Sequence, residues 1–358
     1  MAPRGVTIVT NTPRIGEKIK ISGGGKCNIT NRLMDSSYYD GDQTFIKHVL
    51  TCFDNHALLA WLEKGGLIPV ARKGGHYFCP EGSWELLDLL KRTISPKTKI
   101  YYDTSVQHLE KSGDFFTLTT SRGTMYARRV VIASGGLSYP SIGATGIGFE
   151  IARTLGHTVE TVGPALVGWT LQKEQFWMKE LSGISLPVVL EVGGQKFCDQ
   201  LLFTHKGLTG PSVLNGSLYW TKGSVQIDFL AGESLKKFWH DPKKNISTLL
   251  PLPKRLTLAF LASLGIEDQP LEKLTEVDKE RLTLLSRYTM APAGTFGYTK
   301  AEATRGGVAT HEIDPLTMES RLVEGVYFVG EVIDVTGQVG GYNFQWAASS
   351  AFVASQVL

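Results

Sequence analysis

Three consecutive glycines lie in a short polar stretch, ISGGGKCNITN, at residues 21–31. Glycine has no Cβ, so such a run leaves backbone N–H and C=O groups open to a close ligand. Cys27 follows the run and could act beside a ligand as an acid or a redox thiol. A small, buried apolar role for Cys27 is an equally good interpretation.

A second glycine pair ends the apolar stretch VVIASGG, at residues 130–136. In open α/β sheets, ligands bind beyond the carboxyl ends of the strands, where glycine allows a cofactor to come close. The chain continues as LSYPSIGATGIG before a helix, an arrangement that favours an anion at the helix start. Taken alone, VVIASGG is equally compatible with an ordinary turn after a strand.

The stretch GVYFVGEVIDVTGQVGGYNFQWAASSAFVA, at residues 325–354, contains the strongest group of candidate ligand-binding residues. A buried strand over 326–329 ends at Gly330. Glu331 and Asp334 then supply carboxylates that could hold a chain of hydroxyl groups. The last helix opens with free N–H groups that suit an anion, at Gly340, Gly341, Tyr342 and Asn343. The alternative is a capped helix with a flexible glycine start.

His205, within LLFTHKGLTGP, is a further candidate, as a catalytic acid or base. A lone histidine in a loop is more often structural or simply exposed. The four cysteines have no CxxC or zinc-type spacing, so we expect no metal site and a reducing, cytoplasmic environment.

Periodicity predicts the elements that must position these residues. Apolar spacing indicates helices over 43–52, 56–64, 84–93, 146–155 and 343–357. Residues 5–10 indicate a short buried strand, and 129–133 are apolar enough for a parallel strand buried on both faces. Alternating stretches with turns between them predict a β-meander near 100–109, 114–120 and 124–132.

The pattern changes from about residue 164, where alternating strands replace the α/β pattern. From 233 the chain becomes helical and polar, and the strand–turn pattern returns near 295. We therefore expect an α/β nucleotide-binding domain of 1–163 and 295–358, interrupted by a β-domain of 164–232 and a helical domain of 233–294.

Composition narrows the class of protein. The chain has 358 residues and a net charge of +3, without a long basic run, so a nucleic-acid partner is permitted but not indicated. No apolar run approaches the length of a membrane span, and no signal peptide is evident. The 39 glycines exceed the average share and gather in short clusters, which is typical of sites of close backbone approach.

Several of these stretches together resemble a known family. KIKISGGGKCNITN, VVIASGGLSYPSIGATGIGFEIARTLGH, LLFTHKGLTGPSVL and the 325–354 stretch are similar, in this order, to signature blocks of the BaiN/YhiN-like flavoproteins, the aminoacetone-oxidase-family FAD-binding enzymes. The resemblance implies a two-dinucleotide-binding-type, Rossmann-like FAD domain split by a β-domain and a helical domain. It also implies non-covalent FAD and NAD(P)/FAD-dependent redox chemistry.

The resemblance also assigns cofactor-binding residues. The loop from Ser22 through Gly23, Gly24, Gly25 and Lys26 to Asn28 would approach the flavin. The rest of the cofactor would be lined by Gly135, Gly136, Gly330, Glu331, Asp334, Gly340, Gly341, Tyr342 and Asn343.

One family feature is not found in this sequence. Family members begin with a strand, a GxGxxG turn and a helix, followed by a strand that ends in an acid for the adenosine ribose. Here Thr10 stands where that acid is expected, and no GxGxxG precedes it. Three explanations for this difference are open. The start of the sequence is mis-assigned or the chain is a fragment, the chain is a genuinely short paralogue, or the missing strand is recovered from elsewhere. The chain as given is expected to bind FAD weakly.

The function that the sequence favours is hydride transfer through FAD to or from a small or conjugated substrate, with NAD(P)H as a possible electron donor. Two alternatives are a flavin-dependent reductase of uracil in ribosomal RNA and a degenerate paralogue that is no longer an enzyme. The sequence does not indicate an oligomeric state.

Overall fold

The computed structural model describes residues 5–358, which divide into two compact units. Unit 1 comprises the residues up to Pro164 and Glu302–Leu358, and unit 2 is Ala165–Ala301. The chain therefore leaves unit 1, builds unit 2 and returns. The finer division of the inserted segment into a β-domain and a helical domain stays a prediction.

Unit 1 contains two separate two-stranded parallel sheets. β1 (Thr7–Val9) pairs with β6 (Lys99–Tyr101), and β10 (Val130–Ile132) pairs with β20 (Val326–Phe328). The pairing of β10 with β20 joins the two parts of the chain, 1–163 and 295–358, that were expected to form one α/β domain.

The predicted burial of β1 and β10 is wrong. Thr7 is exposed, and Val131 is 41% exposed. Among the described residues each of these strands pairs along one edge only, whereas β20 is buried throughout. An apolar composition shows that a strand can be buried, but the neighbours that would cover it are not encoded locally.

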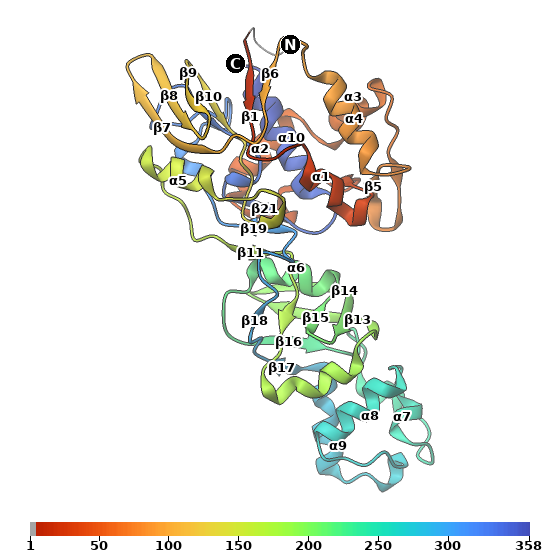
Figure 1. The fold of residues 1–358 in the computed structure, drawn as a ribbon. Helices are drawn as coiled ribbons and strands as arrows, with labels where there is room; N and C mark the ends of the chain where they lie inside the picture. The colour runs from red at the N-terminus through yellow and green to blue at the C-terminus, as the bar shows by residue number, and fades with distance from the viewer. Residues whose placement is uncertain (1–4) are drawn as a thin grey trace. The chain divides into compact units, whose positions relative to one another are not determined.

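Helices surround these strands at the expected positions. Asp42 and Asp54 accept hydrogen bonds from backbone N–H groups of the first turn, and so cap α2 and α3. In Figure 1 the closing helix α10 lies beside α2, and the two pack against each other. The helices of unit 1 are α1 (Glu17–Ile21), α2 (Gln43–Cys52), α3 (Asn55–Lys64), α4 (Ser83–Thr93), α5 (Ile147–Thr154) and α10 (Tyr342–Ser355).

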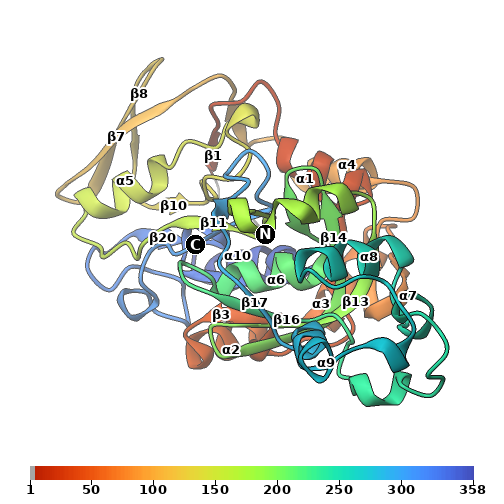
Figure 2. The same ribbon diagram turned by 90° about the horizontal axis from the view of Figure 1, so that it is seen from below.

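Smaller sheets complete unit 1. The meander of β7, β8 and β9 is antiparallel, and Figure 2 shows β7 and β8 as a hairpin beside α5. Another antiparallel sheet, in the order β2–β5–β4, carries the end of the glycine loop. The bounds are β2 (Asn28–Asn31), β3 (Tyr39–Gly41), β4 (Val70–Ala71), β5 (His76–Phe78), β7 (Val106–Ser112), β8 (Phe115–Thr120), β9 (Gly123–Ala127), β11 (Gly163–Ala165), β19 (Ala303–Arg305) and β21 (Val335–Gly337).

Unit 2 is built on one seven-stranded sheet, in the order β17–β16–β13–β14–β15–β12–β18. Every second residue of β13 is buried, which is the period of a sheet with one face on the core. Helix α6 packs on β13 and β14. The strands are β12 (Trp169–Thr170), β13 (Ser185–Val192), β14 (Gln195–Thr204), β15 (Gly207–Thr209), β16 (Val225–Asp228), β17 (Tyr288–Met290) and β18 (Gly294–Thr295), and the helices are α6 (Pro211–Tyr219), α7 (Ile246–Leu249), α8 (Lys254–Ser263) and α9 (Glu276–Leu282).

No helix within residues 5–358 is both long enough and apolar enough to cross a membrane.

Candidate functional site

The glycine loop is a 3₁₀ turn, Ser22–Gly25, that directly follows α1. Gly23 and Gly24 have φ of 56° and 65°, in the left-handed region that favours glycine. Hydrogen bonds from Lys26 N to Gly23 O (3.3 Å) and from Cys27 N to Ser22 O (3.0 Å) close the turn. A Cβ on Gly24 would meet no heavy atom within 4 Å, so this face of the loop backbone is open.

An unsatisfied polar atom lies at the end of this loop. The side-chain Nδ2 atom of Asn28 lies 3.0 Å from the Nδ1 atom of His76 on β5. The Asn28 Oδ1 atom is buried and has no hydrogen-bond partner. A buried acceptor without a partner is costly, so the loop offers a place for a ligand donor. His76 was not among the predicted site residues, because no motif marks a position 48 residues away.

The carboxyl ends of β10 and β20 carry the second group of predicted residues. A 3₁₀ turn, Gly330–Val332, follows β20 and presents Glu331. Its carboxylate accepts hydrogen bonds from Lys18 Nζ (2.5 Å) and from the backbone N–H of Thr304 (2.8 Å). The ion pair ties α1, which leads into the glycine loop, to the end of β20. The structure thus joins two segments that the sequence singled out separately.

The two glycines after β10 have different surroundings. A Cβ on Gly136 would lie 2.4 Å from Thr304 Oγ1 and 2.8 Å from Glu331 Oε1, so there is no room for a side chain. A Cβ on Gly135 would meet only Glu331 Oε2, at 3.9 Å. Gly135 therefore keeps an open face beside the Glu331 carboxylate.

Asp334 lies in an acidic surrounding. Its neighbour in sequence, Val335, pairs with Gly41 across β21 and β3, next to Asp40. Burial, together with the nearby charges of Asp40 and Glu160, raises the pKa of Asp334 to about 6. Burial also raises the pKa of Asp40, and the Arg305 guanidinium opposes that rise. Asp334 can therefore exist protonated or ionised close to neutral pH.

The start of α10 is tightly packed. Gly341 has φ of 91°, and a Cβ there would lie 2.6–2.8 Å from the backbone of Thr30. The Asn343 side chain both accepts from Gly337 N and donates to Gly337 O, each at 2.8 Å. The Tyr342 ring stacks on Tyr38 with centroids 4.8 Å apart. Gly341 is therefore needed for close packing of the helix start against Thr30.

The two predicted catalytic residues belong to different units. Cys27 is fully buried in unit 1. His205 is exposed in the turn between β14 and β15 of unit 2. Their catalytic roles stay predictions.

A serine–histidine–carboxylate arrangement also occurs in unit 1. The His157 ring nitrogens lie 3.1 Å from Glu312 Oε2 and 2.8 Å from Ser320 Oγ. Ser320 Oγ also accepts from the N–H groups of Leu322 and Val323, and burial lowers the pKa of His157. A substrate cannot reach a hydroxyl that is 6% exposed and engaged in this way, so the group is structural.

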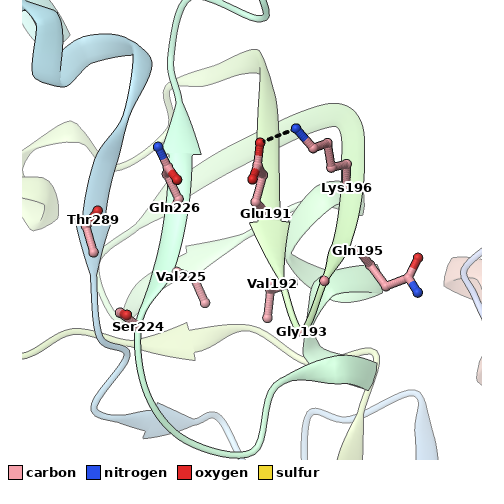
Figure 3. A pocket seen from close by; sticks show the side chains of 10 residues that line it. Glu191, Val192, Gly193, Gln195, Lys196, Ser224, Val225, Gln226 and Thr289 are labelled. Atoms are coloured by element: carbon pink, nitrogen blue, oxygen red, sulfur yellow. Dashed lines mark ion pairs between the residues drawn. The ribbon is translucent and has the colours of Figure 1, made fainter.

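Two surface hollows contain none of the predicted site residues. One, of about 330 Å³, lies at the β13–β14 hairpin. Glu191 and Lys196 form an ion pair there, with Lys196 Nζ 2.6 Å from Glu191 Oε1, and Figure 3 shows this pair. The other, of about 790 Å³, lies between the β7–β8 turn and the end of α5.

Comparison with known proteins identifies the family. Residues 1–357 match the model of the HI0933-like protein Rossmann domain. A ribosomal RNA dihydrouridine synthase of Haemophilus influenzae is 35% identical over 368 residues, which cover 98% of this chain and 92% of that protein. A 3-dehydro-bile acid delta(4,6)-reductase of Clostridium scindens is 32% identical over 375 residues, with coverage of 98% and 92%. The flavoprotein resemblance and the Rossmann-like α/β fold class are thereby confirmed. The chain belongs to the HI0933-like Rossmann-domain family, and with it to the FAD-dependent oxidoreductases that the sequence predicts.

Proposed function

We propose that this protein uses non-covalently bound FAD to transfer hydride to a carbon–carbon double bond conjugated with a carbonyl group. The observation that carries this proposal is the Lys18–Glu331 ion pair, which brings the helix before the open glycine loop to the strand end beside Gly135. Open backbone on both segments is what a flat ring system requires.

The residues present fit the flavin half of the cofactor. The open faces of Gly24 and Gly135 leave space that a Cβ would otherwise occupy, and Asn28 Oδ1 is an acceptor without a partner. When bound, the flavin supplies a two-electron centre that accepts and donates hydride. The protein's part is to hold that ring between the glycine segments.

Charged and polar groups have separate roles in this proposal. Glu331, which now contacts Lys18, would accept hydrogen bonds from the hydroxyl chain of the cofactor. The positive end of α10, near Asn343, would favour negative charge on the ring.

The names of the relatives support the choice of substrate class. One relative is named as a reductase of a bile acid and others as synthases of dihydrouridine in ribosomal RNA. Both products differ from their precursors by hydrogen added across a double bond. We therefore favour a conjugated small molecule as substrate, and keep a uracil base in RNA as the second candidate.

The test is spectroscopic. Purified protein, alone or after incubation with FAD, is expected to show flavin absorbance that NADH or NADPH bleaches without oxygen. A conjugated enone should then restore the absorbance. Uridine-containing ribosomal RNA added in its place tests the second candidate. Protein that gains no flavin absorbance at any FAD concentration would contradict the proposal.

A further inference from the structure

Two of the four cysteines lie opposite each other at the ends of β2 and β5. These strands are antiparallel with Asn28 facing Phe78, so the next pair along is Cys27 and Cys79. The Cys79 N–H group donates to the carbonyl oxygens of Lys26 (3.2 Å) and Cys27 (3.4 Å). Opposed residues of antiparallel strands have Cα atoms about 4.5–5.5 Å apart, within the range that a disulfide spans.

Both thiols are reduced and shielded from solvent. Cys27 and Cys79 are 0% exposed and belong to one apolar cluster with Leu58, Leu62 and Leu86. The other two cysteines, Cys52 on α2 and Cys198 on β14, are exposed. The chain therefore contains one buried thiol pair and two separate exposed thiols.

The two buried thiols are not equivalent. The Cys79 side chain hydrogen-bonds to Cys27, which lowers the pKa of Cys27 and raises that of Cys79, and Ser22 adds a second hydrogen bond to Cys27. Cys27 also has φ of 49°, a backbone conformation that is strained for a residue with a Cβ. Thiolate character favours Cys27 as the attacking sulfur, since the thiolate is the nucleophilic form.

We propose that Cys27 and Cys79 form a redox-active dithiol that hydrogen peroxide converts into an intramolecular disulfide. The Cys27 sulfur attacks one peroxide oxygen, the O–O bond breaks, and water leaves with the thiol proton, so that Cys27 becomes a sulfenic acid. The Cys79 sulfur then attacks Cys27, the S–S bond forms, and the S–O bond breaks to release a second water. Two thiols and one peroxide thus yield one disulfide and two waters.

The disulfide would tie the end of the glycine loop to β5. The loop is already anchored near α4, where Ser83 Oγ donates to Lys20 O at 2.8 Å. Oxidation therefore removes freedom from the segment Ser22–Gly25. Peroxide is a suitable oxidant because it is small and uncharged, and so can reach sulfur atoms that a bulky disulfide reagent cannot. This proposal does not depend on the proposed flavin chemistry.

The test uses a variant that retains only the buried pair, Cys52→Ser with Cys198→Ser. Folded protein is treated with hydrogen peroxide, remaining thiols are blocked with N-ethylmaleimide, and the protein is then denatured and analysed by mass spectrometry. We expect both thiols to be lost, a peptide pair linked through Cys27 and Cys79 to appear, and dithiothreitol to reverse the change. The same linked peptides should appear in the unmodified protein, which covers a failure of the variant to fold.

Single substitutions then establish the order of attack. With Cys79→Ser, dimedone should label the sulfenic acid on Cys27. With Cys27→Ser, Cys79 should stay a thiol under the same treatment. The proposal is overturned if folded protein keeps both thiols, if dimedone labels Cys79 instead of Cys27, or if the linked peptides appear only after unfolding.

Discussion

The loop at 22–25 and the start of α10 are both rich in glycine, but the glycines of the two segments have different surroundings. A Cβ on Gly24 would meet nothing within 4 Å, whereas one on Gly341 would lie 2.6 Å from the Thr30 backbone nitrogen. Both residues have positive φ. A glycine cluster can therefore have at least two physical causes, a backbone face that stays open and a close approach of the chain to itself. Our proposal places the flavin ring against the first kind.

The largest effect is expected at the packed glycine. Gly341→Ala should lower the free energy of unfolding by about 3 kcal/mol or more, because strain at positive φ adds to a clash with backbone that cannot move cheaply. Urea unfolding measures the loss. Gly113→Ala is the matched control, since Gly113 has φ of 58° with nothing near its Cβ position, and should cost about 1–2 kcal/mol. Equal losses in the two variants would show that packing against Thr30 is unimportant.

The next effect concerns the acidic group beside β21. The pKa of Asp334 is raised in the folded protein, so its contribution to stability is present at low pH and is lost as the pH rises through about 6. Asparagine cannot ionise, so Asp334→Asn removes this loss of stability at higher pH. In flavin-free protein the variant should gain about 1–2 kcal/mol relative to the unmodified chain between pH 4 and pH 8, less than the full shift implies because solvent screens the partly exposed carboxyl. Unfolding curves across this range test it. A constant difference between the two proteins would mean that Asp334 titrates normally.

The smallest effect is expected at the ion pair that joins the two binding segments. Lys18→Met should lower stability by no more than about 1 kcal/mol, because the Lys18 side chain is 41% exposed. Its control is Arg92→Met, which breaks the more exposed pair of Arg92 and Asp88 and should have almost no effect. Thermal unfolding compares them. A loss at Lys18 of several kcal/mol would show that the pair is a structural anchor and not an adaptable contact.

The fold was largely predictable because its signals are local. The apolar spacing over 43–52 and the capping Asp42 define α2 at the observed bounds. The burial of β1 and β10 was predicted wrongly, since the partners of a strand lie elsewhere in the chain. Within the site, Glu331 was predicted from the motif, but its partner Lys18, 313 residues away, was not. The same holds for His76, because pairing across the β2–β5 sheet leaves no pattern in the sequence.

The account's central claim is that the open face of the glycine loop receives the flavin. The direct measurement is FAD affinity, by fluorescence titration, of Gly24→Leu and of the control Gly113→Leu. Both substitutions place a side chain at positive φ in open space, so both should destabilise the fold to a similar, modest extent. We predict that Gly24→Leu weakens FAD binding at least tenfold, about 1.4 kcal/mol, while Gly113→Leu leaves it unchanged. Equal FAD affinity in the two variants would contradict the claim.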